Sequence, residues 1–156
     1  SAQLQAICQA LEGRTDVLNL LVVWPHAKIS PSLHGWRNSI PVRTRHALQF
    51  CKASDFAISA AGYNSFHELL YNRIPAILVP QMAPYMDDQE RRARAACERG
   101  CGAFVRAQDL WTLLGHLKSF LDGGEADRVA AALSTLPLPE PGQRTAAAII
   151  DDMRTS

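Results

Sequence analysis

The chain has 156 residues, of which 47% are hydrophobic and 20% charged, and its formal net charge is +1. These proportions are typical of one globular domain with a buried core, and the small net charge argues against a protein that binds nucleic acid through its overall charge. No apolar run approaches the roughly 18 residues that a membrane-spanning helix needs.

Hydrophobic patterns along the chain alternate between helix and strand. The first dozen residues place Leu4, Ile7 and Leu11 at helical spacing and stop at Gly13. The run VLNLLVVW, at 17–24, is typical of a strand covered on both faces, as in parallel sheets. Further strands are predicted at 39–44, 55–61, 75–80 and 102–106, and further helices at 45–53, 65–72, 89–100, 110–121, 125–136 and 144–155.

This alternation predicts the fold class and the domain organisation. Strands and helices joined by short loops favour an α/β fold with a doubly wound parallel sheet and helices on both faces, and we expect residues 1–156 to form a single domain. Such domains usually start with a strand and a phosphate-binding turn, whereas this chain starts with a helix. We therefore expect the chain to be a piece of a longer protein.

The first candidate site is the stretch SAAGYNSFHELL, where a predicted strand meets a predicted helix. Gly62 allows a tight turn and close approach of a ligand, and the helix N-terminus favours an anion such as a diphosphate. Asn64 and Ser65 could add donors, and Glu68 could accept hydrogen bonds from ribose hydroxyls. The alternative is a capping box, in which Ser65 and Glu68 only satisfy backbone donors of the helix.

The second candidate site follows the strand at 75–80. Gln89 stands at the entry of a predicted helix, where an acidic residue and an amide could together recognise sugar hydroxyls. The alternative is ordinary helix chemistry, with Asp87 or Asp88 as the N-cap and Glu90 and Arg94 as an ion pair four residues apart. The neighbouring arginines are expected to form a solvated face: Arg91, Arg92, Arg94 and Arg99.

Other common chemistries lack their sequence patterns. The five histidines show no H-E-x-x-H spacing, and the chain contains no G-x-G-x-x-G, no G-x-x-x-x-G-K-[ST] and no G-x-S-x-G. The four cysteines form no C-x-x-C pair and are too sparse for a secreted disulfide scaffold, which favours a reducing cytoplasm. We expect no metal site in this chain, and the spacing of its Ser, His and Asp residues indicates no catalytic grouping.

The order of the two loops resembles the C-terminal half of GT-B glycosyltransferases. The resemblance runs from about residue 40 to 120 and is closest to family 28, which includes the N-acetylglucosaminyltransferase of peptidoglycan lipid synthesis. One departure is that Arg73 stands where the pattern has glycine, two residues before a proline. The matching positions are Asp55, Gly62, Glu68, Pro75, Pro80, Gln89, Ala93, Gly100 and Ala103.

The resemblance implies a Rossmann-like domain, one half of a GT-B fold, that binds a UDP-sugar. Glu68 would hold the ribose, the turn at 62–65 would lie near the diphosphate, and Asp88 and Gln89 would contact the sugar. The backbone near 45–46 would face the uracil. No cofactor or metal is implied, and the catalytic base would belong to a missing N-terminal domain. The implied substrate-binding residues are Gly62, Tyr63, Asn64, Ser65, Glu68, Asp88 and Gln89.

The function expected from this resemblance is that of the donor-binding domain of an inverting glycosyltransferase. Its acceptor is unknown, with a lipid-linked molecule or a glycan as the expected class, and no nucleic-acid partner is expected. Two alternatives stay open: a UDP-sugar hydrolase or epimerase, and a non-catalytic donor-binding subunit that needs a membrane-anchored partner. The expected location is the cytoplasm, including its membrane face, where a missing domain or partner would provide peripheral attachment.

Overall fold

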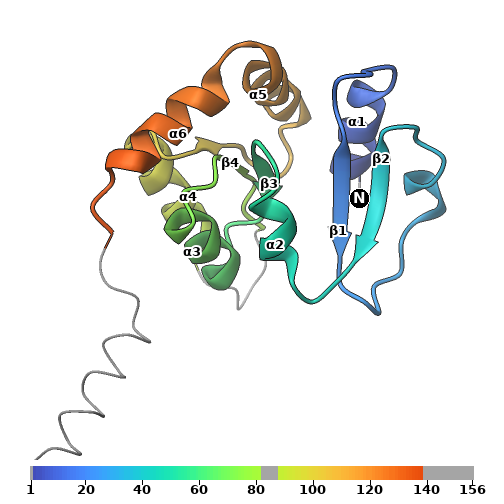
Figure 1. Cartoon of the computed structure of the whole chain (residues 1–156), viewed down its shortest axis with the longest axis horizontal. Coiled ribbons are helices and arrows are strands. Elements are labelled where there is room, and N and C mark those ends of the chain that lie inside the picture. The colour runs from blue at the N-terminus through green and yellow to red at the C-terminus, as the bar shows by residue number, and fades with distance from the viewer. Residues whose placement is uncertain (1, 82–87, 139–156) are drawn as a thin grey trace, which may run out of the picture.

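The computed structural model describes residues 2–81 and 88–138, and it contains every helix and strand predicted within those ranges. The predicted helix at 144–155 lies outside the described residues. Helices and strands alternate along the chain (Figure 1). In chain order they are α1 (Ala2–Leu11), β1 (Asn19–Val23), the 3-10 helix η1 (Pro31–Leu33), β2 (Ser39–Arg43), α2 (Ala47–Cys51), β3 (Ala57–Ser59), α3 (Tyr63–Tyr71), β4 (Ala76–Leu78), α4 (Gln89–Glu98), β5 (Ala103–Phe104), α5 (Leu110–Asp122) and α6 (Glu125–Thr135).

The strands form two parallel sheets. β1 pairs with β2, and β3, β4 and β5 form a second sheet in that order. The α/β class and the parallel pairing are therefore confirmed. Between the two sheets lies a cavity of about 670 Å³ that is lined by side chains of both β1 and β3.

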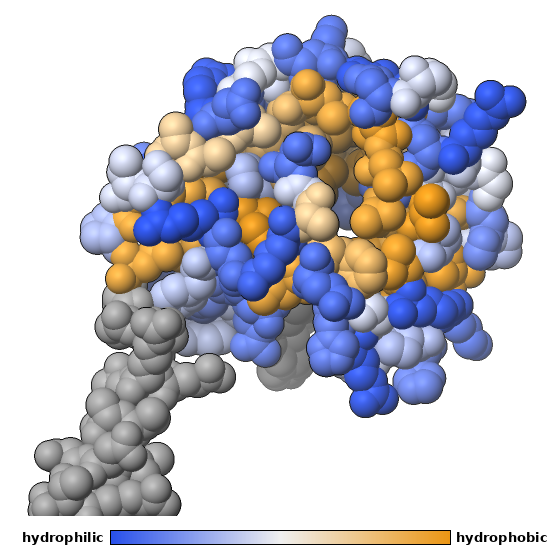
Figure 2. All heavy atoms as spheres, in the orientation of Figure 1, coloured by the Kyte–Doolittle hydropathy of each residue, from blue (hydrophilic) through white to orange (hydrophobic). Residues whose placement is uncertain are grey.

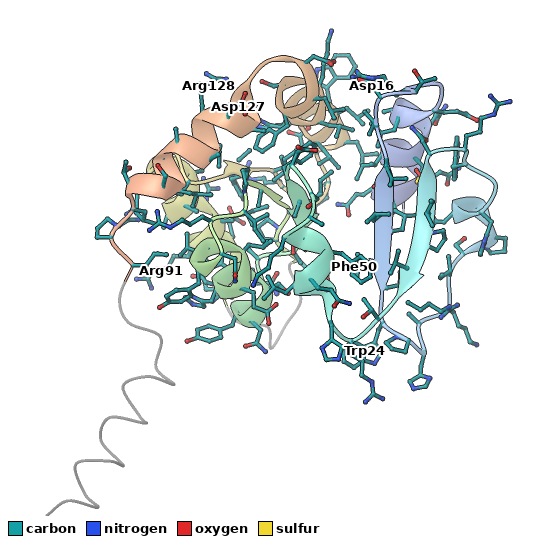
Figure 3. All side chains as sticks on the ribbon, viewed as in Figure 1. Asp16, Trp24, Phe50, Arg91, Asp127 and Arg128 are labelled. Atoms are coloured by element: carbon teal, nitrogen blue, oxygen red, sulfur yellow. The ribbon has the colours of Figure 1, made fainter. Side chains whose placement is uncertain are left out.

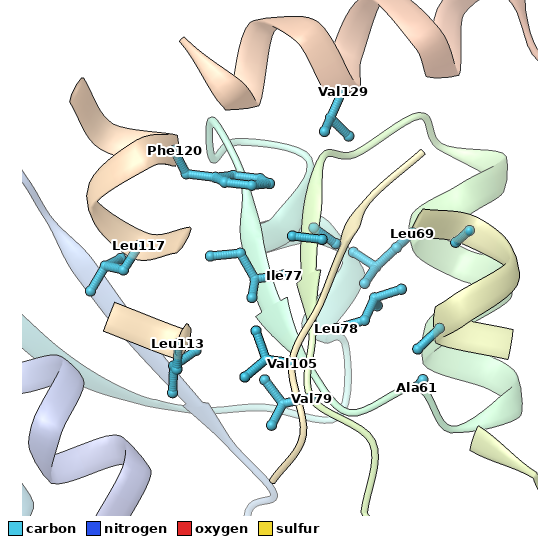
Figure 4. Close-up of a cluster of buried hydrophobic side chains, with 14 of the residues drawn as sticks. Ala61, Leu69, Ile77, Leu78, Val79, Val105, Leu113, Leu117, Phe120 and Val129 are labelled. Atoms are coloured by element: carbon cyan, nitrogen blue, oxygen red, sulfur yellow. The ribbon is translucent and has the colours of Figure 1, made fainter. Parts of the chain in front are cut away.

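The main core surrounds the central strand β4. Ile77, in the middle of β4, is fully buried and pairs with Ile58 of β3 and Ala103 of β5. Figure 4 shows Leu113, Leu117 and Phe120 of α5 on one side of this sheet and Leu69 of α3 on the other. Helices thus cover both faces of the three-stranded sheet, as the doubly wound pattern predicts, and its carboxyl edge is held in place by a close-packed core.

The helix α3 ends in a backbone conformation that is unusual for its residue. Arg73 has φ = 56°, in the left-handed region that costs a non-glycine residue about 1–2 kcal/mol. Its guanidinium donates to the carbonyl oxygens of Leu133 and Ser134 at the end of α6. The arginine at the glycine position of the family pattern therefore keeps the glycine-like conformation and ties α3 to α6.

An ion-pair cluster joins the start of the two-stranded sheet to α5. Arg14 donates two hydrogen bonds to the carboxylate of Asp122, at 3.0 and 2.9 Å, and two more to Asp16, at 2.8 and 2.6 Å. Asp16 is labelled in Figure 3. These hydrogen bonds lower the pKa of Asp122 and lower the pKa of Asp16 to about 2. Both carboxylates therefore stay ionised to lower pH than they would in the unfolded chain.

We expect the stabilisation by this cluster to disappear in acid. In the unfolded chain an aspartate titrates near pH 3.9, whereas the folded-state pKa values are lower, so the contribution is complete above about pH 4 and is lost as pH falls towards about 2. Thermal unfolding of the parent protein and of Arg14→Gln at pH 6, 4, 3 and 2 measures this. Their melting temperatures should differ at pH 6 and converge towards pH 2; an equal difference at every pH would contradict it.

Candidate functional site

The turn between β3 and α3 begins the helix earlier than the sequence predicts. α3 starts at Tyr63 with Gly62 as its N-cap, and Gly62 provides no side-chain cap. Ser65 therefore lies in the first turn and Glu68 in the second, so neither is at the cap. The capping-box alternative for these two residues is wrong, and their side chains are not needed to start the helix.

The first turn of α3 presents free backbone donors. The first hydrogen bond of the helix runs from the N–H of Phe66 to the carbonyl of Gly62, at 2.8 Å. The amides of Tyr63, Asn64 and Ser65 precede it and have no partner within the helix. These donors and the positive end of the helix dipole make this turn suited to an anion.

The second loop reaches the same turn through Gln89. A Cβ built on Gly62 would lie 3.9 Å from Nε2 of Gln89, so the turn before α3 and the start of α4 are in contact. Gln89 is only 3% exposed, and its Oε1 accepts a hydrogen bond from the N–H of Gln81 at 3.1 Å. Because a backbone N–H requires an oxygen as its acceptor, this bond orients the amide and leaves Nε2 on the side of Gly62.

Asp88 directly precedes Gln89 and has a structural role of its own. It is the N-cap of α4, and its Oδ1 accepts a hydrogen bond from the N–H of Arg91 at 3.0 Å. The helix-cap interpretation of Asp88 is confirmed, as is the ion pair between Glu90 and Arg94, whose Nε lies 3.0 Å from Oε1. The cap uses one carboxylate oxygen, and the other has no hydrogen-bond partner among the described residues.

Arg92 is a residue of this region that the sequence analysis missed. It was expected on a solvated face, but its Nε and Nη2 donate to the carbonyl of Ala61 at 3.2 and 2.9 Å, directly before the Gly62 turn. Its guanidinium carbon also lies 5.8 Å from the centre of the Tyr63 ring. The sequence feature that could have indicated this contact is the position of Arg92 three residues after Gln89, which places both residues on the same side of α4. Arg92 thus fixes one loop against the other.

Ser65 and Glu68 face a different space from Gln89. Both line the cavity between β1 and β3, and the carboxylate of Glu68 makes no hydrogen bond or salt bridge with the residues the structure describes. Burial, with the negative charge of Glu68 as a second cause, raises the pKa of the nearby Cys51 thiol. Asn64 is exposed on the same first turn. The predicted site residues therefore lie around α3, with Gln89 and Asp88 on one side and Glu68 on another.

An exposed aromatic residue marks the carboxyl end of β1. Trp24 is 58% exposed, and the guanidinium carbon of Arg45 lies 5.8 Å from its ring centre (Figure 3). The sequence analysis expected only the backbone near 45–46 to face a ligand, so the exposed ring of Trp24 beside Arg45 is a finding of the structure.

Among the described residues no three His, Cys, Asp or Glu side chains gather as a metal site would require, and no helix there has the length and apolarity to cross a membrane.

The family of the chain follows from a comparison with family models. The model of the glycosyltransferase family 28 C-terminal domain matches residues 36–128, more than half of the chain. The chain belongs to glycosyltransferase family 28. The matched range contains both loops that meet at Gly62 and Gln89.

Two curated relatives to which this family 28 domain is similar have the same name. The chain is 33% identical over 123 residues to the UDP-N-acetylglucosamine–N-acetylmuramyl-(pentapeptide) pyrophosphoryl-undecaprenol N-acetylglucosamine transferase of Synechococcus sp. (strain WH7803), covering 70% of the chain and 32% of that protein. It is 28% identical over 105 residues to the enzyme of the same name from Leuconostoc citreum (strain KM20), covering 65% of the chain and 28% of that protein. The chain thus spans about a third of the length of these relatives.

Solved structures agree on the fold of the family 28 domain. The spinosyn rhamnosyltransferase aligns with a TM-score of 0.65 at 19% identity, over 98% of this chain and 40% of that one. A glycotransferase of kitacinnamycin aligns with a TM-score of 0.63 at 16% identity, over 86% of this chain and 34% of that one. At these identities the likeness shows the fold alone, which is that of GT-B glycosyltransferases.

Proposed function

We propose that this domain binds the UDP-sugar donor of an inverting glycosyltransferase. The observation that carries the proposal is the contact between Gly62 and Gln89, because it brings a helix N-terminus and a side-chain amide from the next loop together. Both loops follow paired parallel strands, and ligands of open α/β sheets bind at the carboxyl ends of such strands.

The diphosphate of the donor occupies the first turn of α3 in this proposal. The amides of Tyr63, Asn64 and Ser65 point out of the helix N-terminus, and the dipole of α3 adds partial positive charge. Charge that develops on the leaving diphosphate is stabilised there by donors that are already oriented, which is the main electrostatic contribution a donor domain can make.

The sugar and the ribose are held on either side of α3. Nε2 of Gln89 donates to a sugar hydroxyl, and the oxygen of Asp88 that is not used in the cap accepts from another. Glu68, whose carboxylate has no partner among the described residues, accepts hydrogen bonds from the two ribose hydroxyls. A carboxylate offers two acceptor oxygens for this task, which suits a vicinal diol.

The remaining parts of the reaction belong to a second domain in this proposal. The general base and the acceptor site are supplied from an N-terminal domain, and this is supported by the small share of its relatives that the chain spans. The names of those relatives specify a pyrophosphoryl-undecaprenol acceptor. We extend that class to this protein, so it acts on a lipid-linked acceptor at the cytoplasmic face of a membrane.

Nucleotide selectivity tests the proposal. Calorimetric titration with UDP, GDP and ADP should give measurable binding of UDP, with the two purine nucleotides at least about tenfold weaker, which corresponds to about 1.4 kcal/mol. Affinity for UDP should be modest because only one side of a two-domain cleft is present. Equal binding of all three nucleotides, or no binding of UDP at millimolar concentration, would reject the donor assignment.

A further inference from the structure

The turn that begins α3 has no side-chain cap of its own. Gly62 is the N-cap, and a glycine offers no side chain to bond the free amides of the first turn. A glycine backbone also has more conformational freedom than that of any other residue, so the turn is not fixed by local sterics. The direction in which this turn points is therefore set by contacts from outside the helix.

The helix α4 supplies such contacts at successive residues of the turn. Nε and Nη2 of Arg92 donate to the carbonyl of Ala61, at 3.2 and 2.9 Å. Nε2 of Gln89 lies beside Gly62, 3.9 Å from the place of a Cβ. The guanidinium carbon of Arg92 also lies 5.8 Å from the centre of the Tyr63 ring. One side of α4 thus holds residues 61–63, and Arg92 makes the first and the last of these contacts.

The hydrogen bonds to Ala61 orient a whole peptide unit. Ala61 is fully buried, and its carbonyl lies outside the hydrogen bonds of α3, the first of which is accepted by Gly62. Two N–H groups of one rigid guanidinium converge on this oxygen. Because a peptide bond is planar, holding the carbonyl also fixes the N–H of Gly62 on the opposite side of the unit. Arg92 thus satisfies a buried carbonyl and orients the backbone that enters α3.

The arginine itself lies on a firmly packed part of α4. Its neighbour Ala93 is fully buried, and Gln89, one turn earlier, is almost completely buried and accepts a hydrogen bond from the N–H of Gln81. The side chain of Asp88 caps the same end of the helix. The first turn of α4 is therefore a fixed support from which Arg92 aligns the start of α3.

The ring of Tyr63 is directed along the side of α3. It packs against the ring of His67, one turn further along the helix, with 4.4 Å between the ring centres. Arg92 contacts the same ring from α4. A ring held by these two residues does not lie across the N-terminus of the helix, so it leaves the free amides of the first turn uncovered.

The contacts of Arg92 lie apart from the cavity between the two sheets. In Figure 2 apolar residues, in orange, gather along both sides of that hollow. Among the described residues its lining includes Ser65 and Glu68, but not Ala61, Gly62 or Arg92. The turn is therefore aligned from the α4 side of α3.

We propose that Arg92 is a positioning residue for the diphosphate of the donor. It holds the start of α3 so that the amides of Tyr63, Asn64 and Ser65 face the anion in one arrangement. Its permanent positive charge adds to the attraction without a contact of its own. Donors that are oriented before the ligand arrives need no reordering when it binds. This inference rests on the donor site proposed above.

Binding of UDP and of uridine separates this role from a merely structural one, because only UDP carries the diphosphate. In NMR titrations Arg92→Gln should weaken UDP binding at least about tenfold and leave uridine binding within about twofold of the parent protein. Equal weakening of both ligands would overturn the proposal, as would unchanged UDP affinity. Arg92→Lys keeps the charge and one donor, so its UDP affinity should lie between those of the parent and Arg92→Gln. Full affinity in the lysine variant would show that charge alone suffices and would overturn the positioning role.

Arg99→Gln is the matched control for the loss of charge. Arg99 lies at the other end of α4, where its Nη1 donates to the carbonyl of Ala95 at 3.0 Å. The substitution removes the same charge and a similar hydrogen bond from the same helix, away from the turn. UDP affinity should stay within about twofold of the parent, since a distant exposed charge is screened by salt. A loss as large as that of Arg92→Gln would overturn the proposal.

Relaxation of backbone ¹⁵N nuclei without nucleotide measures the order of the turn directly. The order parameters of the amides of Gly62, Tyr63 and Asn64 should fall in Arg92→Gln and recover in part in Arg92→Lys, while those of α5 stay as in the parent. Unchanged order parameters in the turn would overturn the proposal. If the parent binds neither UDP nor uridine, the donor site is rejected, and the relaxation data still decide whether Arg92 orders the turn.

Discussion

Glu68→Gln is expected to weaken UDP binding by about 1.5–3 kcal/mol, a factor of roughly 10 to 160, without a change in thermal stability. A carboxylate can accept from both ribose hydroxyls, whereas an amide keeps one acceptor oxygen and loses the charge-assisted strength. Stability is unaffected because Glu68 is exposed in the second turn of α3, with no hydrogen bond or ion pair of its carboxylate to the described residues. Calorimetry and thermal unfolding of the variant measure the two effects.

Two further variants make the Glu68 result specific. Glu68→Ala should weaken binding at least as much and still leave stability nearly unchanged, because Glu68 is not part of a capping box. Glu98→Gln neutralises another exposed glutamate, at the end of α4, and should leave UDP binding unchanged. If Glu68→Gln binds UDP as tightly as the parent protein, Glu68 does not hold the ribose.

Ile77→Ala is expected to lower the free energy of unfolding by about 2–5 kcal/mol. Ile77 is fully buried in the central strand of the three-stranded sheet, with helices on both faces, so the lost methylene contacts leave a cavity that neighbouring side chains cannot fill. Urea unfolding at pH 7 measures the change from the midpoint at constant slope.

Ile40→Ala is the matched control for this core substitution. Ile40 lies in β2 and is 48% exposed, so the same chemical change should cost less than about 1 kcal/mol. Similar losses for Ile40→Ala and Ile77→Ala would contradict the placement of the core around β4.

The elements of the fold and their parallel pairing could be predicted from local sequence patterns, but the space between β1 and β3 could not. The apolar run around Ile77 and the alternation of strand and helix are local signals, and they predicted β4 and its neighbours correctly. The separation of β1 from β3 depends on what lies between them in space. No pattern within either strand carries that information, so the division of the described strands into two sheets could not be predicted.

At the candidate site, too, the sequence predicted the elements but not all of the contacts between side chains and backbone. Gly62 and Gln89 each follow one of two neighbouring parallel strands, and the structure brings the two residues into contact. The helix start was missed by two residues, since Gly62 caps α3 and Ser65 only resembles a cap in its spacing to Glu68. Arg92 looked like a surface charge because its acceptor is a backbone carbonyl, which the sequence does not mark.

The most direct test of the donor-site proposal is an NMR titration of the ¹⁵N-labelled protein with UDP. We expect saturable shifts of the backbone amides of Tyr63, Asn64 and Ser65, since these donors face the diphosphate, and smaller shifts of the amides around Glu68. With a UDP-sugar the side-chain amide of Gln89 should shift as well, because its Nε2 lies beside Gly62. Saturable binding that leaves the first turn of α3 unperturbed, or no binding of UDP at millimolar concentration, would contradict the proposal.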